Sequence, residues 1–261
     1  MELARQLRRK MALGEVVFGT FVCEMKTAGV AAILHRSGFD YLILDMEHGL
    51  YDPDQAGRII DSAKRHGICT IVRVPWHEPG MISRILDAGA EGILVPMIRT
   101  MEEVDRAVSA AKYAPVGRRG LHPIRPHTDF VAPASMETYC REANANLILG
   151  IQVETCAAVE LIEPIAANPG VDMVFVGPGD LSAEMGNFQG LSHPDVLEVV
   201  RRVARACDAH GKIASSHSGS FEDIRRVAEV VVKMISNSDE MTRFHEGASG
   251  FIAGAREALG G

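Results

Sequence analysis

The chain has 261 residues, of which 47% are hydrophobic and 23% charged, so it can form a globular protein with a sizeable core. Its formal net charge of -7 argues against nucleic acid as a partner, and no basic stripe overturns this. The start does not resemble a signal peptide, and no apolar stretch approaches the ~20 residues that a membrane span needs. Five scattered cysteines without a Cys-x-x-Cys pair favour a reducing compartment, so we expect a cytoplasmic protein.

Short apolar runs alternate with helical patterns along almost the whole chain. The runs have the near-continuous hydrophobicity of parallel strands that are covered on both faces. They span residues 16–22, 41–47, 69–75, 92–98, 147–154, 173–178, 212–215 and 231–236. Residues 52–67 and 100–115, which lie between such runs, carry apolar residues at helical spacing and begin with Asp-Pro or Thr. This alternation predicts an α/β protein, a (β/α)8 TIM barrel that forms one domain over residues 1–261.

An open, doubly wound sheet is the main alternative to the barrel. Such a sheet usually carries a glycine-rich first turn, whereas the first strand here leads into CEMKTAG, which has no G-x-G-x-x-G. The main irregularity is the long connection from Pro115 to Glu142, and above all residues 117–134, which are rich in Pro, Arg and His. Long loops of this kind often cover binding sites, so we expect a binding role for it.

Polar side chains follow four of the predicted strands at the point where each strand ends. Because barrel enzymes build their active sites at the carboxyl ends of the strands, these residues are candidates for chemistry. Each one alone has an ordinary explanation as a strand-end residue, an ion-pair partner or a turn cap. Together they are hard to explain as core packing. They are Asp45, Glu47 and His48 after the second strand, Arg73 on the third, Gln152 and Glu154 on the fifth, and Asp180 after the sixth.

The acidic residues of this set predict a metal site. Glu154 and Asp180 offer carboxylate oxygens from neighbouring strands, with no cysteine nearby. Oxygen ligands favour Mg²⁺, Mn²⁺ or a similar hard divalent ion over structural zinc. Gln152 lies on the same strand face as Glu154, because strand side chains alternate with period two, and it could hold a metal-bound water.

The remaining residues of the set suit charge stabilisation and proton transfer. Arg73 is permanently cationic and could stabilise a developing oxyanion. His48 carries an imidazole, the side chain most often used for proton transfer, and could move a proton if Asp45 orients it. The amides of Gly179 and Asp180, in the sequence GPGD, could bind a substrate carboxylate.

Six motifs in order resemble those of the HpcH/HpaI aldolase family. They are LDMEHG, VRVP, GILVPMI, RRG, GIQVET and VDMVFVGPGDLSAEMG, and the similarity runs from about residue 13 to residue 190. The resemblance implies a barrel whose last helix is exchanged between subunits, giving a homo-oligomer, either a trimer or a hexamer. It also implies a class II lyase that uses Mg²⁺, Mn²⁺ or Co²⁺. Such an enzyme reversibly cleaves a 4-hydroxy-2-oxo acid to pyruvate and an aldehyde through a metal-bound pyruvate enolate.

By the same resemblance, Glu154 and Asp180 are direct metal ligands, and Gln152 and Asp45 act through water. Arg73 would steady the enolate, His48 would relay the proton, and amides around Gly179 and Asp180 would hold the pyruvate carboxylate.

The chain also departs from the family pattern. Gly179 stands where the family usually has Ala. Residues 121–133 do not match the usual continuation after RRG, and we expect them to lie on the aldehyde side of the site. The seventh and eighth strands lack the family's glycines. His122, His127 and His217 could be ligands, but a surface or loop position is the default expectation.

Three other functions stay open at this point. The same enolate site could serve oxaloacetate decarboxylation or another enolate addition. A class I mechanism would need a Schiff-base lysine, for which Lys212 and Lys233 are the candidates near the last strands. A non-catalytic barrel that binds a small oxo acid is a third possibility.

Overall fold

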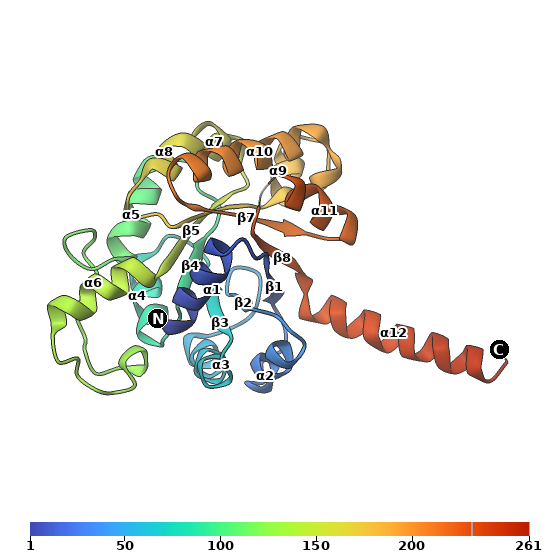
Figure 1. The fold of residues 1–261 in the computed structure, drawn as a ribbon, viewed down its shortest axis with the longest axis horizontal. Coiled ribbons are helices and arrows are strands. Elements are labelled where there is room, and N and C mark those ends of the chain that lie inside the picture. The colour runs from blue at the N-terminus through green and yellow to red at the C-terminus, as the bar shows by residue number, and fades with distance from the viewer. Residues whose placement is uncertain (231, 261) are drawn as a thin grey trace.

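Eight parallel strands close into a barrel in chain order, from β1 to β8 (Figure 1). The structure is a computed structural model that describes residues 1–230 and 232–260. The strands are β1 (Val17–Val22), β2 (Tyr41–Asp45), β3 (Cys69–Arg73), β4 (Gly92–Val95), β5 (Ile148–Val153), β6 (Met173–Val176), β7 (Ile213–Ser218) and β8 (Met234–Asp239). Each overlaps a predicted strand, so the barrel prediction is confirmed and the doubly wound alternative is wrong. Val231, the first residue of the predicted eighth strand, lies outside the described residues.

Helices cover the outside of the barrel and connect successive strands (Figure 1). They are α1 (Glu2–Ala12), α2 (Gly29–Arg36), α3 (Pro53–His66), α4 (Pro79–Asp87), α5 (Met101–Ala111), α6 (Met136–Asn146), α7 (Cys156–Glu160), α8 (Ile162–Ala167), α9 (Pro178–Glu184), α10 (Pro194–Ala209), α11 (Phe221–Glu229) and α12 (Glu240–Ala258). Sequence signals set their ends: Asp52 and Thr100 form capping boxes at the starts of α3 and α5. Gly67 ends α3 in the left-handed conformation that glycine tolerates best. No helix of the described residues is long and apolar enough to cross a membrane.

Helix α1 closes the amino end of the barrel. Its buried residues Ala4, Leu7 and Met11 share one apolar cluster with side chains from inside the barrel, such as Ile71 and Met173. The backbone N–H of Ala4 also donates to the buried carboxylate of Glu91, just before β4, at 2.7 Å. The open end is therefore the one where the strands finish, which is where the polar residues were expected.

The long segment of residues 117–134 lies at the amino end of the barrel, so its expected place on the aldehyde side of the site is wrong for this chain. Lys64, in the last turn of α3, donates to the Pro126 carbonyl at 3.2 Å and to Asp129 at 2.5 Å. Arg119 pairs with Asp87, the last residue of α4, at 2.6 Å. The reason is chain direction: α5 runs antiparallel to the strands and returns the chain to the amino end before the segment begins.

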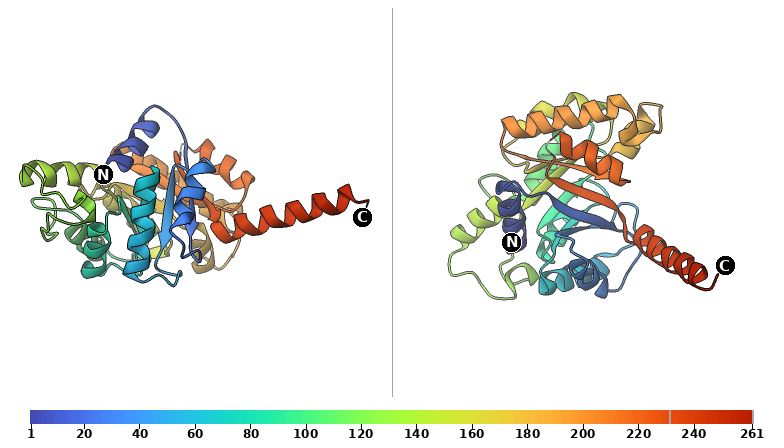
Figure 2. Two further views of the ribbon diagram at one scale, coloured as in Figure 1. Left: turned by 90° about the horizontal axis from the view of Figure 1, so that it is seen from below. Right: turned by 45° about the vertical axis from the view of Figure 1, so that its right-hand side comes forward.

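The last helix, α12, extends away from the barrel in every view (Figures 1 and 2). Of its described residues only Glu240 is buried, where its carboxylate accepts hydrogen bonds from the amides of Cys23, Glu24 and Met25. Phe244 and Phe251 are 63% and 73% exposed, an unusual position for aromatic side chains. Within one chain, therefore, little of α12 packs against the barrel.

Candidate active site

Asp45 and Arg73 form a buried bidentate ion pair at the carboxyl ends of β2 and β3. The two residues are register partners, so their side chains leave adjacent strands at the same level. Arg73 donates from Nε to Asp45 Oδ1 at 2.9 Å and from Nη2 to Oδ2 at 2.7 Å. Burial alone would raise the pKa of Asp45, but the hydrogen bonds and charge of Arg73 outweigh it and hold the pKa below its usual value. Asp45 is therefore an ionised residue that fixes the guanidinium.

The turn after β2 brings Glu47 to the same arginine. Glu47 Oε2 lies 3.2 Å from Arg73 Nη1, is sealed from solvent and accepts no hydrogen bond among the described residues. Burial raises the pKa of Glu47. The Asp45 carboxylate accepts from the backbone amide of His48 at 3.4 Å and does not contact its imidazole, so Asp45 does not orient that ring as expected. The His48 side chain is 67% exposed, and its Nε2 lies 3.9 Å from Glu47 Oε2.

Glu154 is buried at the carboxyl end of β5, with 1% of its surface exposed. One carboxylate oxygen accepts from the backbone N–H of Met97 at 2.6 Å, and the other contacts the side-chain amide of Gln152, as their shared strand face predicts. Burial and the negative charges of Glu47 and Asp180 raise the pKa of Glu154 to about 7. The buried carboxyl group of Glu154 therefore lies near the negative charges of two other acids and contacts one side-chain amide.

In the turn from β6 into α9, Gly177 has no room for a side chain, whereas Gly179 does. A Cβ on Gly177 would lie 2.8 Å from Glu154 Oε2, so a side chain there would displace the carboxylate. A Cβ on Gly179 would meet nothing within 4 Å, which means that the family's usual Ala would also fit. Gly179 and Asp180 lie exposed in the first turn of α9, where backbone amides lack helical partners.

A cavity of about 260 Å³ joins these strand ends at the mouth of the barrel. Four predicted residues line it, namely Arg73, Gln152, Gly179 and Asp180. Other residues that were not predicted as site residues also line the cavity, including Phe21, Phe175, His217, Ser238 and Asp239.

His217 is the clearest of the missed residues, since a surface or loop position was expected for it. Its ring lies edge-on to Phe21 with centroids 5.4 Å apart, and its Nδ1 lies 3.1 Å from Ser236 Oγ. Burial and then the charge of Arg73 lower the pKa of His217 to about 4, so the imidazole is neutral at neutral pH. β7 continues to Ser218, whereas the predicted strand ends at Ser215. His217 therefore lies at the carboxyl end of the strand. His122 is exposed, and His127 lies at the amino end, where its Nδ1 is 3.2 Å from the Asp87 carbonyl.

The side-chain oxygens at the barrel mouth have the chemistry that suits a hard divalent cation. Among residues 1–230 and 232–260, no three His, Cys, Asp or Glu side chains form a ready-made metal cluster. Two sealed oxygens, Gln152 Oε1 and Glu47 Oε2, nevertheless have no hydrogen-bond partner among the described residues. Side-chain oxygens are the donors that Mg²⁺ or Mn²⁺ prefers. Burial first, and then the charges of Glu47 and Asp180, raise the pKa of Glu154.

Neither candidate Schiff-base lysine is near this cavity. Lys212 immediately precedes β7 and Lys233 immediately precedes β8, which puts both at the amino end of the barrel. No lysine of the described residues lines the mouth cavity. The arrangement therefore gives no support to class I chemistry.

Comparison with known proteins gives one consistent picture. The family model described as HpcH/HpaI aldolase/citrate lyase matches residues 18–243. A 5-keto-4-deoxy-D-glucarate aldolase from Salmonella arizonae is 34% identical over 215 residues, which cover 82% of this chain and 83% of the relative. The crystal structure of an HpcH/HpaI aldolase from Desulfitobacterium hafniense DCB-2 superposes with a TM-score of 0.89 at 30% identity, covering 96% of each chain. A family protein from Burkholderia cenocepacia J2315 superposes with a TM-score of 0.86 at 29% identity, covering 98% of this chain and 99% of the other.

Proposed function

Since the chain belongs to the HpcH/HpaI aldolase/citrate lyase family and is a carbon–carbon lyase, we propose that it is a class II aldolase. It reversibly cleaves a 4-hydroxy-2-oxo acid to pyruvate and an aldehyde. The observation that carries this proposal is geometric: Arg73, Gln152 and Asp180 line one cavity at the barrel mouth, and the buried Glu154 contacts Gln152. A divalent cation there would offset the negative charges of the acids.

Glu154 and Asp180 would hold the cation, with Gln152 positioned by its contact to Glu154. Bound there, a divalent cation would act as a Lewis acid that stabilises negative charge on the substrate's keto oxygen, an effect worth several kcal/mol. The oxygen-only donor set fits Mg²⁺, Mn²⁺ or Co²⁺. Asp45, which is fully engaged by Arg73, would act only indirectly on this site.

The chain's own residues supply the rest of the chemistry. Arg73 lines the cavity and is held in one orientation by Asp45 and Glu47, so its charge is directed before substrate arrives. It would stabilise the negative charge left on the pyruvyl half as the C3–C4 bond breaks. His48, exposed beside Glu47, would take the 4-hydroxyl proton through water. The amides of Gly179 and Asp180 would hold the substrate carboxylate.

The aldehyde half of the substrate would meet a mixed wall at the mouth. Phe21 and Phe175 supply apolar surface, and the neutral imidazole of His217 and the residues Ser238 and Asp239 supply polar groups. This lining suits a short hydroxylated aldehyde better than a purely alkyl one. The compound in the relatives' name, 5-keto-4-deoxy-D-glucarate, is therefore the first substrate to assay.

Exchange of the pyruvate methyl protons in D₂O, followed by NMR, tests the proposal. We expect exchange that stops with EDTA and resumes with added Mg²⁺ or Mn²⁺. Exchange that persists in EDTA, together with a borohydride-trapped lysine adduct, would contradict the metal mechanism. Pyruvate binding without exchange would indicate a non-catalytic oxo-acid binder, and an oxaloacetate assay run in parallel would identify decarboxylation.

We also propose that α12 is exchanged between subunits of a trimer or hexamer. The support is the exposed apolar surface on α12, and on β1 and α2, where Phe18 and Ile33 are 38% and 61% exposed. Light scattering should give a trimeric or hexameric mass for the full chain. A Phe244→Asp/Phe251→Asp variant should lower that mass, and a monomeric wild-type protein would refute the exchange.

A further inference from the structure

A second and larger cavity lies at the amino end of the barrel. Its volume is about 610 Å³, within the range of small-molecule sites. Its wall includes Ile213 at the start of β7, Lys233 just before β8, and residues from the carboxyl-terminal half of α10. The proposed active site lies at the opposite ends of the same strands. This cavity thus belongs to no part of the machinery described above.

The charge of this cavity is strongly one-sided. Five cationic side chains line it and one acidic side chain, Asp208, accompanies them. The cations are Arg8, Arg201, Arg205, Lys212 and Lys233. The excess is notable because the whole chain carries a formal net charge of -7. A concave surface with charges of one sign concentrates the electric field and raises the local concentration of counter-ions.

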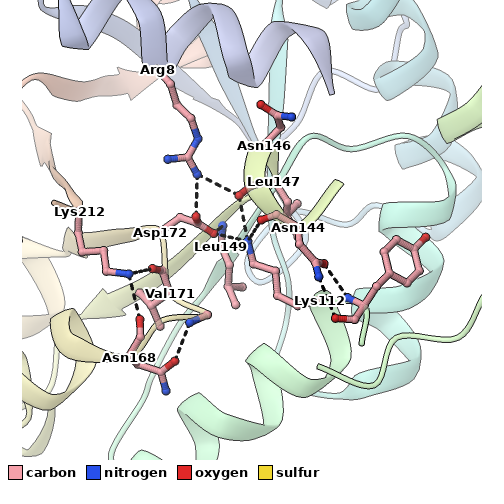
Figure 3. Close-up of polar contacts among 12 residues, drawn as sticks. Arg8, Lys112, Asn144, Asn146, Leu147, Leu149, Asn168, Val171, Asp172 and Lys212 are labelled. Atoms are coloured by element: carbon pink, nitrogen blue, oxygen red, sulfur yellow. Dashed lines mark hydrogen bonds and ion pairs between the residues drawn. The ribbon is translucent and has the colours of Figure 1, made fainter. Parts of the chain in front are cut away.

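The two lysines of the cavity have no acidic partner in the described part of the chain. Lys212 Nζ donates to the carbonyls of Asn168 and Val171 at 3.1 and 2.7 Å (Figure 3). Lys233 Nζ donates to the Met11 carbonyl at 3.1 Å. Both side chains are half-buried, so each ammonium group has lost part of its water without gaining a carboxylate.

Behind the wall, the carboxylate of Asp172 is already shared by two cations. Figure 3 shows Arg8 and Lys112 converging on Asp172, at 2.7 and 2.6 Å. Two cations therefore use one acid, and Arg8 Nε is sealed from solvent without a partner in the part of the chain that the structure describes. Burial lowers the pKa of Lys112, the charge and hydrogen bond of Asp172 raise it, and the positive charges of Arg8 and Lys212 lower it again. The field around the cavity is thus positive even after its internal ion pairs are counted.

We propose that this cavity is a second binding site, for a small organic anion that carries two or more negative charges. The ammonium groups of Lys212 and Lys233 would bind its charged groups, and Arg201 and Arg205, which share Glu198 at 3.5 and 2.9 Å, would contribute from the rim. The apolar residues Met11 and Val230 would contact its carbon body. Phosphate esters and polycarboxylates share this chemistry. The proposal is independent of the activity assigned to the mouth.

Calorimetric titration of the full-length protein, first freed of metal and then dialysed free of chelator, tests the site, with glycerol 2-phosphate and citrate as probes. We expect saturable binding of at least one of them, and the stronger probe identifies the phosphate or the carboxylate source. The Lys212→Gln/Lys233→Gln variant should weaken that binding by about tenfold or more, because two charge-assisted contacts are lost. Arg9→Gln/Arg36→Gln is the matched control, since both arginines are exposed and line neither cavity, and the variant also removes two positive charges.

The remaining outcomes also decide the proposal. If Lys212→Gln/Lys233→Gln lowers the melting temperature, Arg201→Gln/Arg205→Gln replaces it as the test. This second variant changes only exposed positions and should show the same loss of anion binding. Absence of saturable binding by both probes would overturn the site, as would an equal loss in Arg9→Gln/Arg36→Gln. Binding that disappears in Arg73→Gln but survives in both double variants would assign the anion to the barrel mouth instead.

Discussion

At the amino end of the barrel, Lys112 is 2% exposed and donates to Asp172 and to the carbonyls of Asn144 and Leu147. At the carboxyl end, Glu154 is equally buried but lies near the negative charges of Glu47 and Asp180. Both ends therefore bury a titratable group, but Lys112 contacts a carboxylate of opposite charge, whereas Glu154 accepts hydrogen bonds only from a backbone amide and a side-chain amide among the described residues. The difference teaches that burial alone does not mark a functional site: an unbalanced charge does, because something outside the chain has to balance it.

The largest effect should come from removing the metal-binding acid. Glu154→Gln should lower metal-dependent cleavage by roughly 10³-fold, which corresponds to the several kcal/mol that a metal ion supplies. Its folding stability should not fall, because the change removes a carboxylate from among others. Steady-state kinetics and urea denaturation measure the two quantities. Glu160→Gln, an exposed acid on α7, is the control. Normal turnover by Glu154→Gln would remove it from the site.

A slightly smaller loss is expected at the arginine. Arg73→Lys should lower the cleavage rate by about 10²–10³-fold, because a lysine cannot reproduce the two parallel hydrogen bonds to Asp45 that fix the positive charge. Single-turnover kinetics check the rate, and circular dichroism checks that the variant is folded. Arg36→Lys, at the exposed end of α2, should be unaffected. A near-normal rate for Arg73→Lys would exclude a role in charge stabilisation.

The amino end should respond in stability rather than in rate. Lys112→Met should lower the free energy of unfolding by about 3 kcal/mol, at the lower end of the range for a broken buried pair, because Arg8 still contacts Asp172. The rate per folded molecule should stay normal. Urea denaturation gives the first quantity and active-site titration the second. If instead catalysis falls while stability does not, the contrast between the two ends is wrong.

The smallest effect concerns pH. Because the folded-state pKa of His217 is about 4, below the usual 6.5, its contribution to stability is present above pH 6.5 and is lost as the pH falls. From pH 7 to pH 5 the wild type should lose about 2 kcal/mol relative to His217→Gln, as the 1.36 kcal/mol per pKa unit implies. Urea denaturation at both pH values measures this difference. His122→Gln, an exposed histidine, should track the wild type, and parallel curves for His217→Gln and wild type would show that the imidazole is not buried when folded.

Local patterns predicted the elements well, and their failures have local causes. The shared face of Gln152 and Glu154 followed from the period of a strand and is seen in their contact. The seventh strand was predicted too short because its serines interrupt the apolar run, and His217 was missed for that reason. The predicted place of residues 117–134 is wrong because it rested on the composition of the loop alone. The preceding helix α5 returns the chain to the amino end of the barrel, and the loop therefore lies there.

The sequence by itself determined the order of the eight strands and the polar residues that end them, because hydrophobic periodicity and caps act over a few neighbouring residues. Only the tertiary structure decided which of those residues meet. Arg73 donates a hydrogen bond to Asp45, which lies 28 residues earlier in the chain, because the two residues are register partners on β3 and β2. Barrel closure likewise brings His217 of β7 into one cavity with Phe21 of β1. Such contacts depend on strand register and closure, which no short stretch of sequence encodes.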